Sequence, residues 1–383
     1  MDFVKIIEQL DDFTRITLVL FVLALVIQFT YYLLVYLRVI WSKEHTETPQ
    51  VDGMPPVSVI ICARNEDENL ALNLTPVLEQ DYPLFEVIVV NDCSEDNTEQ
   101  VLTEFKQKYP HLRSTIIRKS GSFRNGKKFA ATVGIKTAQY EWLLFTDADC
   151  RPVSPRWMAS MSRHFIDTKD IVLGYGGYHE QKDYLNQWIR YDACFNALQY
   201  FGFAQMGKAY TGVGRNLAYR KSVFFEHTGF APHAHILSGD DALFVNQAAT
   251  RKNVAMTCIH EAHTRSISKK TFREWIWQKR RQLTAGKLFR NSQIFWLALE
   301  PFSRILLWAS FLISMIFCPL WIYILIVFII RMIVFMWVMS VTVKRFNEPG
   351  ILPHAIFFDF MMPFLYLYMI LLNRISSKHN KWN

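Results

Sequence analysis

The sequence predicts an α/β protein in which a mostly parallel β-sheet, covered by helices on both faces, is tied to transmembrane helices. Three observations predict this fold class. β-Branched apolar runs alternate with helical patterns in the middle of the 383-residue chain, polar residues follow each of these runs directly, and longer apolar runs lie on either side. Strands that alternate with helices are typical of parallel sheets, because a parallel connection needs a crossover helix.

The first long apolar run covers residues 16–41 and contains no charged residue before Arg38. A helix of this length crosses a hydrocarbon core of about 30 Å. A cleaved signal peptide would have an apolar region of roughly 7–15 residues and then a small-residue cleavage site, and neither feature is present. We therefore expect residues 1–50 to form an N-terminal transmembrane helix and a linker.

The C-terminal region, residues 291–383, is expected to hold two or three further membrane helices. Residues 302–343 are almost wholly apolar and predict a helical hairpin of two spans. The main interruptions are Arg304, Pro319 and Arg331. Residues 351–372 are also apolar, although they contain Pro353, His354, Asp359 and Pro363. They are compatible with a kinked span and with a segment lying in the membrane interface, and the pattern does not choose between the two.

Charge predicts that residues 51–290 form a cytoplasmic domain of a multi-pass protein of the cell membrane. The segment before the first span is net acidic, whereas Arg38 and a basic central region follow it. A basic cluster lies just before the second span, at Lys269, Lys270, Arg273, Lys279, Arg280, Arg281, Lys287 and Arg290. Such a cluster is typical of attraction to anionic membrane lipids. A membrane-tied chain without a matching motif is not expected to bind nucleic acid.

Polar residues end each predicted strand of the central region. The strand–loop–helix patterns are "VSVIICARNEDENL" from residue 57, "FEVIVVNDCSEDNTEQ" from residue 85 and "YEWLLFTDADC" from residue 140. Ligands bind outside the carboxyl ends of the strands in such sheets, so these polar residues are expected to share one crevice. They are Arg64, Asn65, Glu66, Asp92, Asp96, Asp147 and Asp149.

Two of these acids, Asp147 and Asp149, are separated by Ala148 alone. Residues i and i+2 of an extended strand point to the same side, so both carboxylates can face one site. They would repel each other unless a positive group lay between them. Paired oxygen ligands suit a hard cation, Mg²⁺ or Mn²⁺, that keeps positions open for a phosphate. The alternative is an ordinary Asp-rich surface turn.

Six motifs in a fixed order carry a family resemblance. They are "VSVIICARNEDENL", "VIVVNDCSEDNTEQ", "GKKFAATVGI", "LLFTDADC", "GDDALF" and "QKRRQ". Over about residues 55–285 this set resembles the inverting family-2 glycosyltransferases, and the layout is similar to that of the membrane-bound cellulose, chitin and hyaluronan synthases. The resemblance implies a Rossmann-like, nucleotide-sugar-binding sheet of the glycosyltransferase A type.

The resemblance also implies a donor site. In it, Glu66 and Asp92 hold the nucleoside, Lys127 or Lys128 lies near the nucleotide, and Asp147 and Asp149 bind the metal and the diphosphate. A carboxylate can accept hydrogen bonds from ribose hydroxyls or a base imide, and a lysine provides a point charge for phosphate. Glu66 and Asp92 could equally be helix N-terminal acids that the helix dipole stabilises.

On the acceptor side, the resemblance assigns the general base to Asp241, with Asp240 beside it. The alternative is that both acids cap a helix. The chain has Asp-Asp here where the family more often has Glu-Asp. Gln278 and Arg281 are expected to close over the diphosphate, but Gln282 stands where processive members carry Trp, which puts processivity in doubt. Gly212 to Asn216 resemble the acceptor-side loop.

We therefore expect a metal-dependent, membrane-anchored transferase that uses a UDP-sugar and inverts the anomeric carbon. Its partners would be membrane lipids and a saccharide or lipid-linked acceptor hydroxyl. One alternative is transfer to a polyisoprenyl phosphate. Another is a membrane transporter or polysaccharide-export component, because Arg331 lies inside a predicted span and ionisable groups there are often functional. The small number of spans and the acid-lined domain argue against the transporter.

Overall fold

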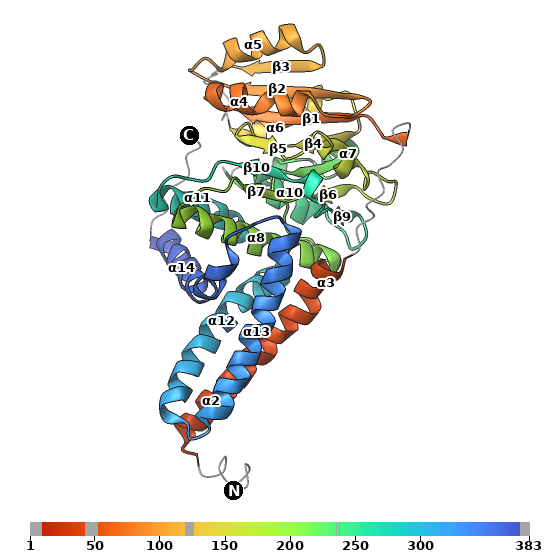
Figure 1. Ribbon diagram of the computed structural model, residues 1–383. Helices are drawn as coiled ribbons and strands as arrows, with labels where there is room; N and C mark the ends of the chain where they lie inside the picture. Colours follow the sequence, from red (N-terminus) through yellow and green to blue (C-terminus); the bar gives the residue numbers. More distant parts are fainter. Residues whose placement is uncertain (1–9, 43–52, 119–125, 235, 237, 376–383) are drawn as a thin grey trace.

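The computed structural model describes residues 10–42, 53–118, 126–234, 236 and 238–375. Figure 1 shows an α/β domain from which the long helices α2, α12 and α13 extend together in one direction. Residues 1–9, which contribute to the charge argument for orientation, lie outside the described ranges.

The main sheet has seven strands in the order β3-β2-β1-β4-β8-β6-β9. Their bounds are β1 Val57–Ala63, β2 Phe85–Asp92, β3 Leu112–Ile117, β4 Trp142–Phe145, β6 Ile171–Leu173, β8 Leu217–Arg220 and β9 Val254–Met256. Strand β8 runs antiparallel to both of its neighbours, β4 and β6, and the remaining pairs of this sheet are parallel. The predicted mostly parallel sheet is confirmed.

Helices cover both faces of this sheet because its strands are buried on both sides. Val57 and Val59 of β1 pack with α4 (Asp67–Leu78), α5 (Thr98–Lys108) and α7 (Trp157–Ser162). Ile60, which points the other way, packs with α6 (Lys127–Thr137). The close approach of α6 requires Gly134, since a Cβ there would lie 2.8 Å from Ile60 Cγ2.

A second sheet of three short strands has the order β5-β10-β7. Strand β10 (Thr264–Ser266) is antiparallel to β5 (Cys150–Pro152) and parallel to β7 (Gly176–Tyr178). The register places Ser266 opposite Cys150. The chain passes from β4 of the main sheet to β5 through residues 146–149, so the two predicted metal ligands lie between the two sheets.

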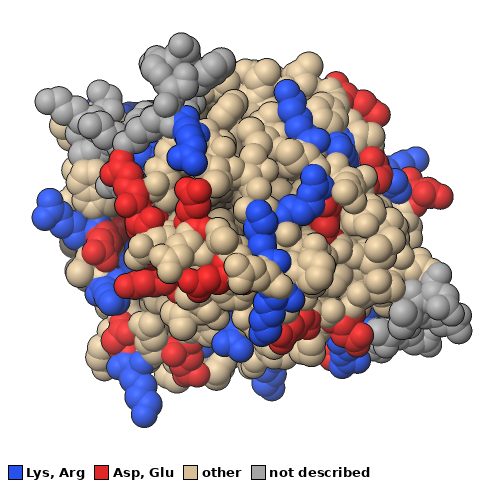
Figure 2. All heavy atoms as spheres, turned by 90° about the horizontal axis from the view of Figure 1, so that it is seen from above, with Lys and Arg blue, Asp and Glu red and all other residues tan. Residues whose placement is uncertain are grey.

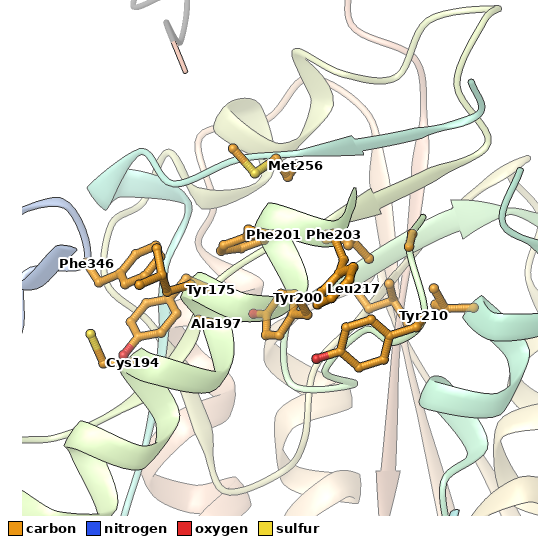
Figure 3. Close-up of a cluster of buried hydrophobic side chains, with 14 of the residues drawn as sticks. Tyr175, Cys194, Ala197, Tyr200, Phe201, Phe203, Tyr210, Leu217, Met256 and Phe346 are labelled. Atoms are coloured by element: carbon orange, nitrogen blue, oxygen red, sulfur yellow. The ribbon is translucent and has the colours of Figure 1, made fainter. Parts of the chain in front are cut away.

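The α/β domain and the membrane helices share one core, which is built around α8 (Tyr184–Gln205). The π-helical turn Tyr32–Tyr36, which follows α2 (Asp12–Tyr31), packs against α8 at Gly202, where a Cβ would lie 2.6 Å from Val35 O. Figure 3 shows Phe346, which follows α13, beside Tyr175 of the α/β domain. Their rings stack with centroids 4.5 Å apart. The two regions are therefore joined by packing as well as by chain connections.

Among the described residues, four helices are long and apolar enough to cross a membrane: Asp12–Trp41, Asn291–Phe317, Trp321–Arg345 and Leu352–Ile375. The first corresponds to the predicted N-terminal span. The second and third, α12 and α13, form the predicted hairpin, although α12 begins at Asn291 and is longer than the apolar run from residue 302 suggested.

Helix α14 (Ala355–Ile375) is the segment that the sequence left undecided. It continues through Pro363 without a break. Figure 1 shows it beside α11 (Phe272–Gly286) and α8, close to the α/β domain. Trp188 of α8 contacts Phe358, with ring centroids 5.2 Å apart, and Arg280 of α11 donates a hydrogen bond to Asn373 Oδ1 at 2.8 Å. The helix thus packs on both the membrane hairpin and the α/β domain.

Arg331, the basis of the transporter alternative, lies inside the packed helices with 0% of its surface exposed. Its guanidinium donates to the two carboxylate oxygens of Asp359 at 2.7 and 3.1 Å and to Gln28 Oε1 at 2.9 Å. Gln28 in turn donates to Ser303 at 2.7 Å. These contacts join α2, α12, α13 and α14, so Arg331 has a packing role and no longer supports the transporter alternative.

Candidate active site

A cavity of about 1760 Å³ lies at the carboxyl edge of the main sheet. Among the side chains that line it are six charged residues predicted from the sequence: Glu66, Lys127, Asp147, Asp149, Asp240 and Asp241. They come from the loop after β1, the start of α6, the loop after β4 and the start of α10 (Asp240–Ala248). The expectation that separate elements deliver acids to one crevice agrees with this arrangement.

Lys127 lies between two groups of carboxylates. Its Nζ is 2.7 Å from Asp147 Oδ1 and 3.9 Å from Asp240 Oδ2. Burial by itself would lower the pKa of Lys127, but the carboxylates of Asp147, Asp240 and Asp241 raise that pKa well above its usual value. Burial would raise the pKa of Asp147, but Lys127, Arg215 and Arg281 together more than offset this, so that pKa is lowered. Both partners are therefore charged at neutral pH.

Asp149 is held from the second sheet. Ser266 of β10 donates a hydrogen bond to Asp149 Oδ2 at 2.9 Å, and the Cys150 thiol donates to Oδ1 at 3.3 Å. A ligand atom of Asp147, one of Asp149 and the sulfur of Cys150 lie within 4.8 Å of one another. Burial raises the pKa of the Cys150 thiol well above its usual value, and sulfur is a poor ligand for hard cations such as Mg²⁺ and Mn²⁺. The two carboxylates are consequently the candidate metal ligands.

Arg215 is a second cation at this place, and the sequence did not identify it. Its guanidinium lies over the Tyr178 ring, 4.3 Å from the centroid. Burial lowers the pKa of Arg215, but Tyr178, Cys150 and Asp149 together raise it above the usual value, so the side chain stays charged. Arg215 lies within the segment 212–216, and its position there is the one feature of the sequence that indicates it. The glycines of that segment are what the motif emphasises. Arg215 and Lys127 together reduce the repulsion between Asp147 and Asp149.

Asp241 is packed against the backbone of the glycine-containing loop. A Cβ on Gly214 would lie 1.9 Å from Asp241 Oδ2, so only glycine permits this contact. Burial, followed by the charge of Asp240, raises the pKa of Asp241 from 3.8 to about 8. Gly239, with φ +76°, is the N-cap residue of α10. Asp240 and Asp241 are therefore the first two helical residues and not the cap.

The two predicted nucleoside ligands differ in their surroundings. Glu66 is the N-cap residue of α4, but its side chain makes no capping hydrogen bond; it accepts from Asn69 Nδ2 at 2.5 Å and lines the cavity. Asp92 ends β2, six residues before α5 begins, and is 0% exposed. Neither of its oxygens accepts a hydrogen bond from an N–H or O–H group of the described residues. Burial raises the pKa of both side chains.

Helix α11 turns one face towards the cavity. Trp277, Gln278, Arg281 and Gln282 all line it. The sequence associated Gln282 with the loss of an aromatic surface, but Trp277, which is 41% exposed, provides such a surface from the neighbouring face of the helix. The helical period brings residues 277, 278, 281 and 282 to one side, a relationship that the local motif alone did not reveal.

The members of the basic cluster before the second span lie in several different environments. Lys279 pairs with Asp192, Arg280 binds α14, and Arg290 donates to Asn246 O at 3.3 Å. Four other members, Lys269, Arg273, Arg281 and Lys287, line the cavity. Figure 2 shows basic and acidic side chains together on the face seen from above.

Three predicted site residues, Asp92, Lys128 and Asn216, do not line the cavity. Lys128 Nζ donates to the carbonyl oxygens of His233 and Ile236 at 2.7 and 2.8 Å, whereas Lys127 faces the carboxylates. Asn216 is buried; its amide donates to Tyr175 O and Ala262 O and accepts from Trp157 Nε1. Neither side chain lines the cavity, so the structure does not bring Lys128 or Asn216 into this site. Gly212 does line it.

Comparison with known proteins agrees with this geometry. Residues 58–227 match the model of the glycosyl transferase family 2. Poly-β-1,6-N-acetyl-D-glucosamine synthase of Staphylococcus epidermidis is 35% identical over 104 residues, which are 27% of this chain and 23% of that protein. Glycosyltransferase AglE of Haloferax volcanii is 30% identical over 214 residues, 54% of this chain and 66% of that protein. The chain thus spans less than a quarter of the length of the first of these relatives.

A solved structure extends the likeness to the membrane helices. The mannosyltransferase PcManGT from Pyrobaculum calidifontis, in complex with GDP-Man and Mn²⁺, superposes with a TM-score of 0.61. The match covers 95% of this chain and 99% of that one at 15% identity, which shows a shared fold. The family model spans the strands and loops that carry the predicted donor residues, so residues 58–227 form a domain of the glycosyl transferase family 2.

Proposed function

We propose that this chain is a membrane-anchored glycosyltransferase that moves a sugar from a nucleotide-sugar to an acceptor hydroxyl with inversion at the anomeric carbon. One observation carries the proposal. The Asp147–Asp149 pair and the high-pKa carboxyl of Asp241 line the same cavity. Such a site has acids for a metal-bound diphosphate and a base for the incoming nucleophile.

The nucleoside of the donor would lie near Asp92, at the carboxyl edge of the main sheet. An unpaired buried carboxylate is costly unless a ligand supplies a hydrogen-bond donor. A base imide N–H or ribose hydroxyls would supply it, and Glu66 would take a second hydroxyl. Uracil has such an imide N–H, and a UDP-sugar is the donor that we propose. Guanine also offers a ring N–H to a carboxylate, so GDP-sugars form the comparison set of the test below.

Asp147 and Asp149 would hold the divalent cation. Two carboxylates offer the oxygen ligands that Mg²⁺ and Mn²⁺ prefer, and the Cys150 thiol is a poor ligand for either ion. Lys127 now occupies one oxygen of Asp147, and carboxylate oxygens retain further lone pairs for a metal. When bound, the cation supplies a Lewis acid that neutralises the departing diphosphate.

The chain's own residues would carry the transfer as follows. Asp241 takes the proton of the acceptor hydroxyl as its oxygen forms a bond to the anomeric carbon. The bond from that carbon to the diphosphate oxygen breaks at the same time, on the opposite face, and the electron pair leaves with the nucleoside diphosphate. Arg281 and Gln278 of α11 face the cavity and would donate hydrogen bonds to the leaving group.

The membrane arrangement belongs to the proposal as well. We infer a multi-pass protein, with α2, α12, α13 and α14 associated with the bilayer and the α/β domain, residues 51–290, in the cytoplasm. The cytoplasm is where nucleotide-sugars are made, and the charge distribution of the sequence favours this orientation. Labelling of single introduced cysteines from each side of sealed vesicles tests it.

The activity is tested with the full chain in detergent against a panel of UDP- and GDP-sugars. Release of the nucleoside diphosphate is measured with membrane lipids present, and the anomeric configuration of the product is read by NMR. We expect turnover of a UDP-sugar and a product configuration opposite to that of the donor. Retention of configuration would reject direct displacement by the acceptor. Turnover of GDP-sugars alone would reject the assignment of uracil as the nucleobase of the donor.

A further inference from the structure

The cavity does not end at the donor edge. It continues past α11 to α12 and α14, two of the four helices long enough to cross a membrane. Its volume of about 1760 Å³ exceeds the roughly 300–1,000 Å³ of a pocket for one small ligand, so a second molecule fits beside a nucleotide-sugar. Figure 1 shows α14 next to α11 and the upper part of α12, which places this end of the cavity at the junction of domain and membrane helices.

Each of these membrane helices turns one face to the cavity. The lining residues of α14 include Tyr366, Ile370 and Arg374, at i, i+4 and i+8. Those of α12 include Ile294, Leu297 and Pro301, at i, i+3 and i+7. On the other side, α12 and α14 expose large apolar side chains such as Phe302 and Leu371. Each of these two helices therefore has one face on the cavity and another face towards the region that lipid would occupy.

The walls of this end carry apolar side chains, several cations and the acids Glu274 and Glu300, of which Glu300 pairs with Arg304. Arg273, Lys287 and Arg374 line the cavity, and none of them forms an ion pair with a carboxylate of the described residues. In the proposed donor site, Lys127, Arg281 and a divalent cation would already balance the diphosphate, so Arg273, Lys287 and Arg374 are available to a second anion. Unpaired cations beside an apolar wall fit an anionic group attached to a hydrocarbon chain.

We infer that the acceptor is a membrane lipid with a phosphate-bearing head group, and that it binds between α11, α12 and α14. This inference rests on the proposed function and names the acceptor class for it. The hydrocarbon chain follows the Leu297 and Ile370 faces, and the phosphate lies near Arg374 and Arg273. The hydroxyl of the head group reaches Asp241. A free saccharide would leave the apolar wall unused, and a neutral glycolipid would leave the cations unpaired.

The first experiment follows the labelled sugar. The full chain is incubated in detergent with the radiolabelled donor found by the panel and with total lipid from membranes that contain the protein. We expect the label in the organic phase, bound to a lipid that anion-exchange resin retains. Label in a water-soluble polymer, or in an uncharged lipid, overturns the inference. If no donor releases its nucleotide at all, the proposed function itself has failed.

A matched pair of variants tests the binding place. Ile370→Glu puts a carboxylate on the cavity face of α14, whereas Leu371→Glu puts one on the neighbouring face, which does not line the cavity. Both side chains are similarly exposed, at 41% and 46%, so their effects on membrane insertion should be alike. We expect Ile370→Glu to raise the KM for the lipid at least tenfold, with the KM for the donor changed less than twofold. Leu371→Glu should leave both KM values within twofold of the wild type, whatever its effect on the amount of folded protein.

A second pair tests the charge. Arg273→Gln removes a cation that lines the cavity, and Lys270→Gln removes a cation of the same cluster that does not. Only Arg273→Gln should raise the KM for the lipid, and the increase should shrink at high ionic strength because the wild-type attraction is then screened. Equal effects within either pair would mean that the lipid does not occupy this part of the cavity.

Discussion

The Nζ atom of Lys127 lies 2.7 Å from Asp147 Oδ1 and 3.9 Å from Asp240 Oδ2. This single cation therefore links the acids of the proposed donor site to the acid pair of the proposed base. Its ammonium group also lies in the region where a metal-bound diphosphate would carry negative charge. The two neighbouring lysines of the "GKK" motif thus have different surroundings: Lys127 forms ion pairs with these carboxylates, whereas Lys128 donates to backbone carbonyl oxygens.

Lys127→Gln should reduce kcat by roughly 10²–10³-fold, because it removes a preorganised charge from the leaving-group side of the site. Lys128→Gln is the matched control. It should keep the rate within a few-fold and lower the melting temperature instead, since Lys128 binds two backbone carbonyls. Steady-state kinetics and thermal melting of both variants separate the roles. A large loss of rate in Lys128→Gln alone would reverse the assignment.

Chelation of divalent cations should abolish transfer. EDTA would leave Asp147 and Asp149 without the ion that compensates the diphosphate, and added Mn²⁺ or Mg²⁺ should restore the rate. Asp149→Ala should lose donor turnover at every metal concentration and still fold. Asp167→Ala, an exposed acid distant from the cavity lining, serves as the control. An unchanged rate in EDTA would exclude the metal from the reaction.

Asp241→Asn should reduce transfer to a hydroxyl acceptor by roughly 10²–10⁴-fold, the usual contribution of a general base. Substantial remaining activity would favour the polyisoprenyl phosphate alternative, because a phosphate oxygen needs little help from a base. For the wild type, kcat/KM should rise with pH up to about 8, the pKa of Asp241, since the base must first lose its proton. A rate that is independent of pH between 6 and 9 would contradict this assignment.

Asp241 should also make folding stability depend on pH, in the opposite direction to kcat/KM. The pKa of Asp241 is about 8 in the folded protein and about 3.8 when unfolded, so between these values the folded state binds more protons. Folding stability attributable to Asp241 therefore falls as pH rises through this range. Asp241→Asn removes that dependence, and its melting temperature should exceed that of the wild type by more at pH 8.5 than at pH 5.5.

Asp92→Asn should weaken donor binding without destabilising the protein. The wild-type carboxylate is buried and lacks an N–H or O–H partner among the described residues, so a neutral isostere lowers the cost of burial. Asp96 is the matched comparison. It accepts from the backbone N–H groups of Asp67 and Thr98, and Asp96→Ala should lower the melting temperature. Nucleotide binding is measured by calorimetry, and normal UDP affinity in Asp92→Asn would remove Asp92 from the donor site.

Much of the fold could be predicted because its elements follow local patterns. The apolar runs before Arg64, before Cys93 and before Thr146 correspond to β1, β2 and β4, and the carboxyl ends of parallel strands necessarily meet at one edge. The acids of the site were found for this reason. Arg215 and Ser266 were not, because β7, β8 and β10 are too short to show a period.

The position of the basic cluster could not be predicted, for a different reason. The pattern of charges on α11 predicts which residues share a face of that helix, but it does not predict which other element packs against each face. Here α14 packs against one side, so Arg280 binds Asn373, while Arg273 and Arg281 face the cavity. The proline and polar residues of 351–372 concealed this arrangement, since they weaken the pattern of a continuous helix.

Arg331→Met should destabilise the protein by about 3–5 kcal/mol, because it leaves Asp359 buried without its main partner. The double variant Arg331→Met, Asp359→Asn should recover much of that loss, since Arg304 keeps its pair with Glu300 at 2.9 Å. Lys344→Met, at the exposed end of α13, is the control for removal of a cation from this helix. Thermal melting in detergent measures all three. If Arg331→Met instead lost glycosyl transfer with an unchanged melting temperature, Arg331 would have a functional role that its packing does not require.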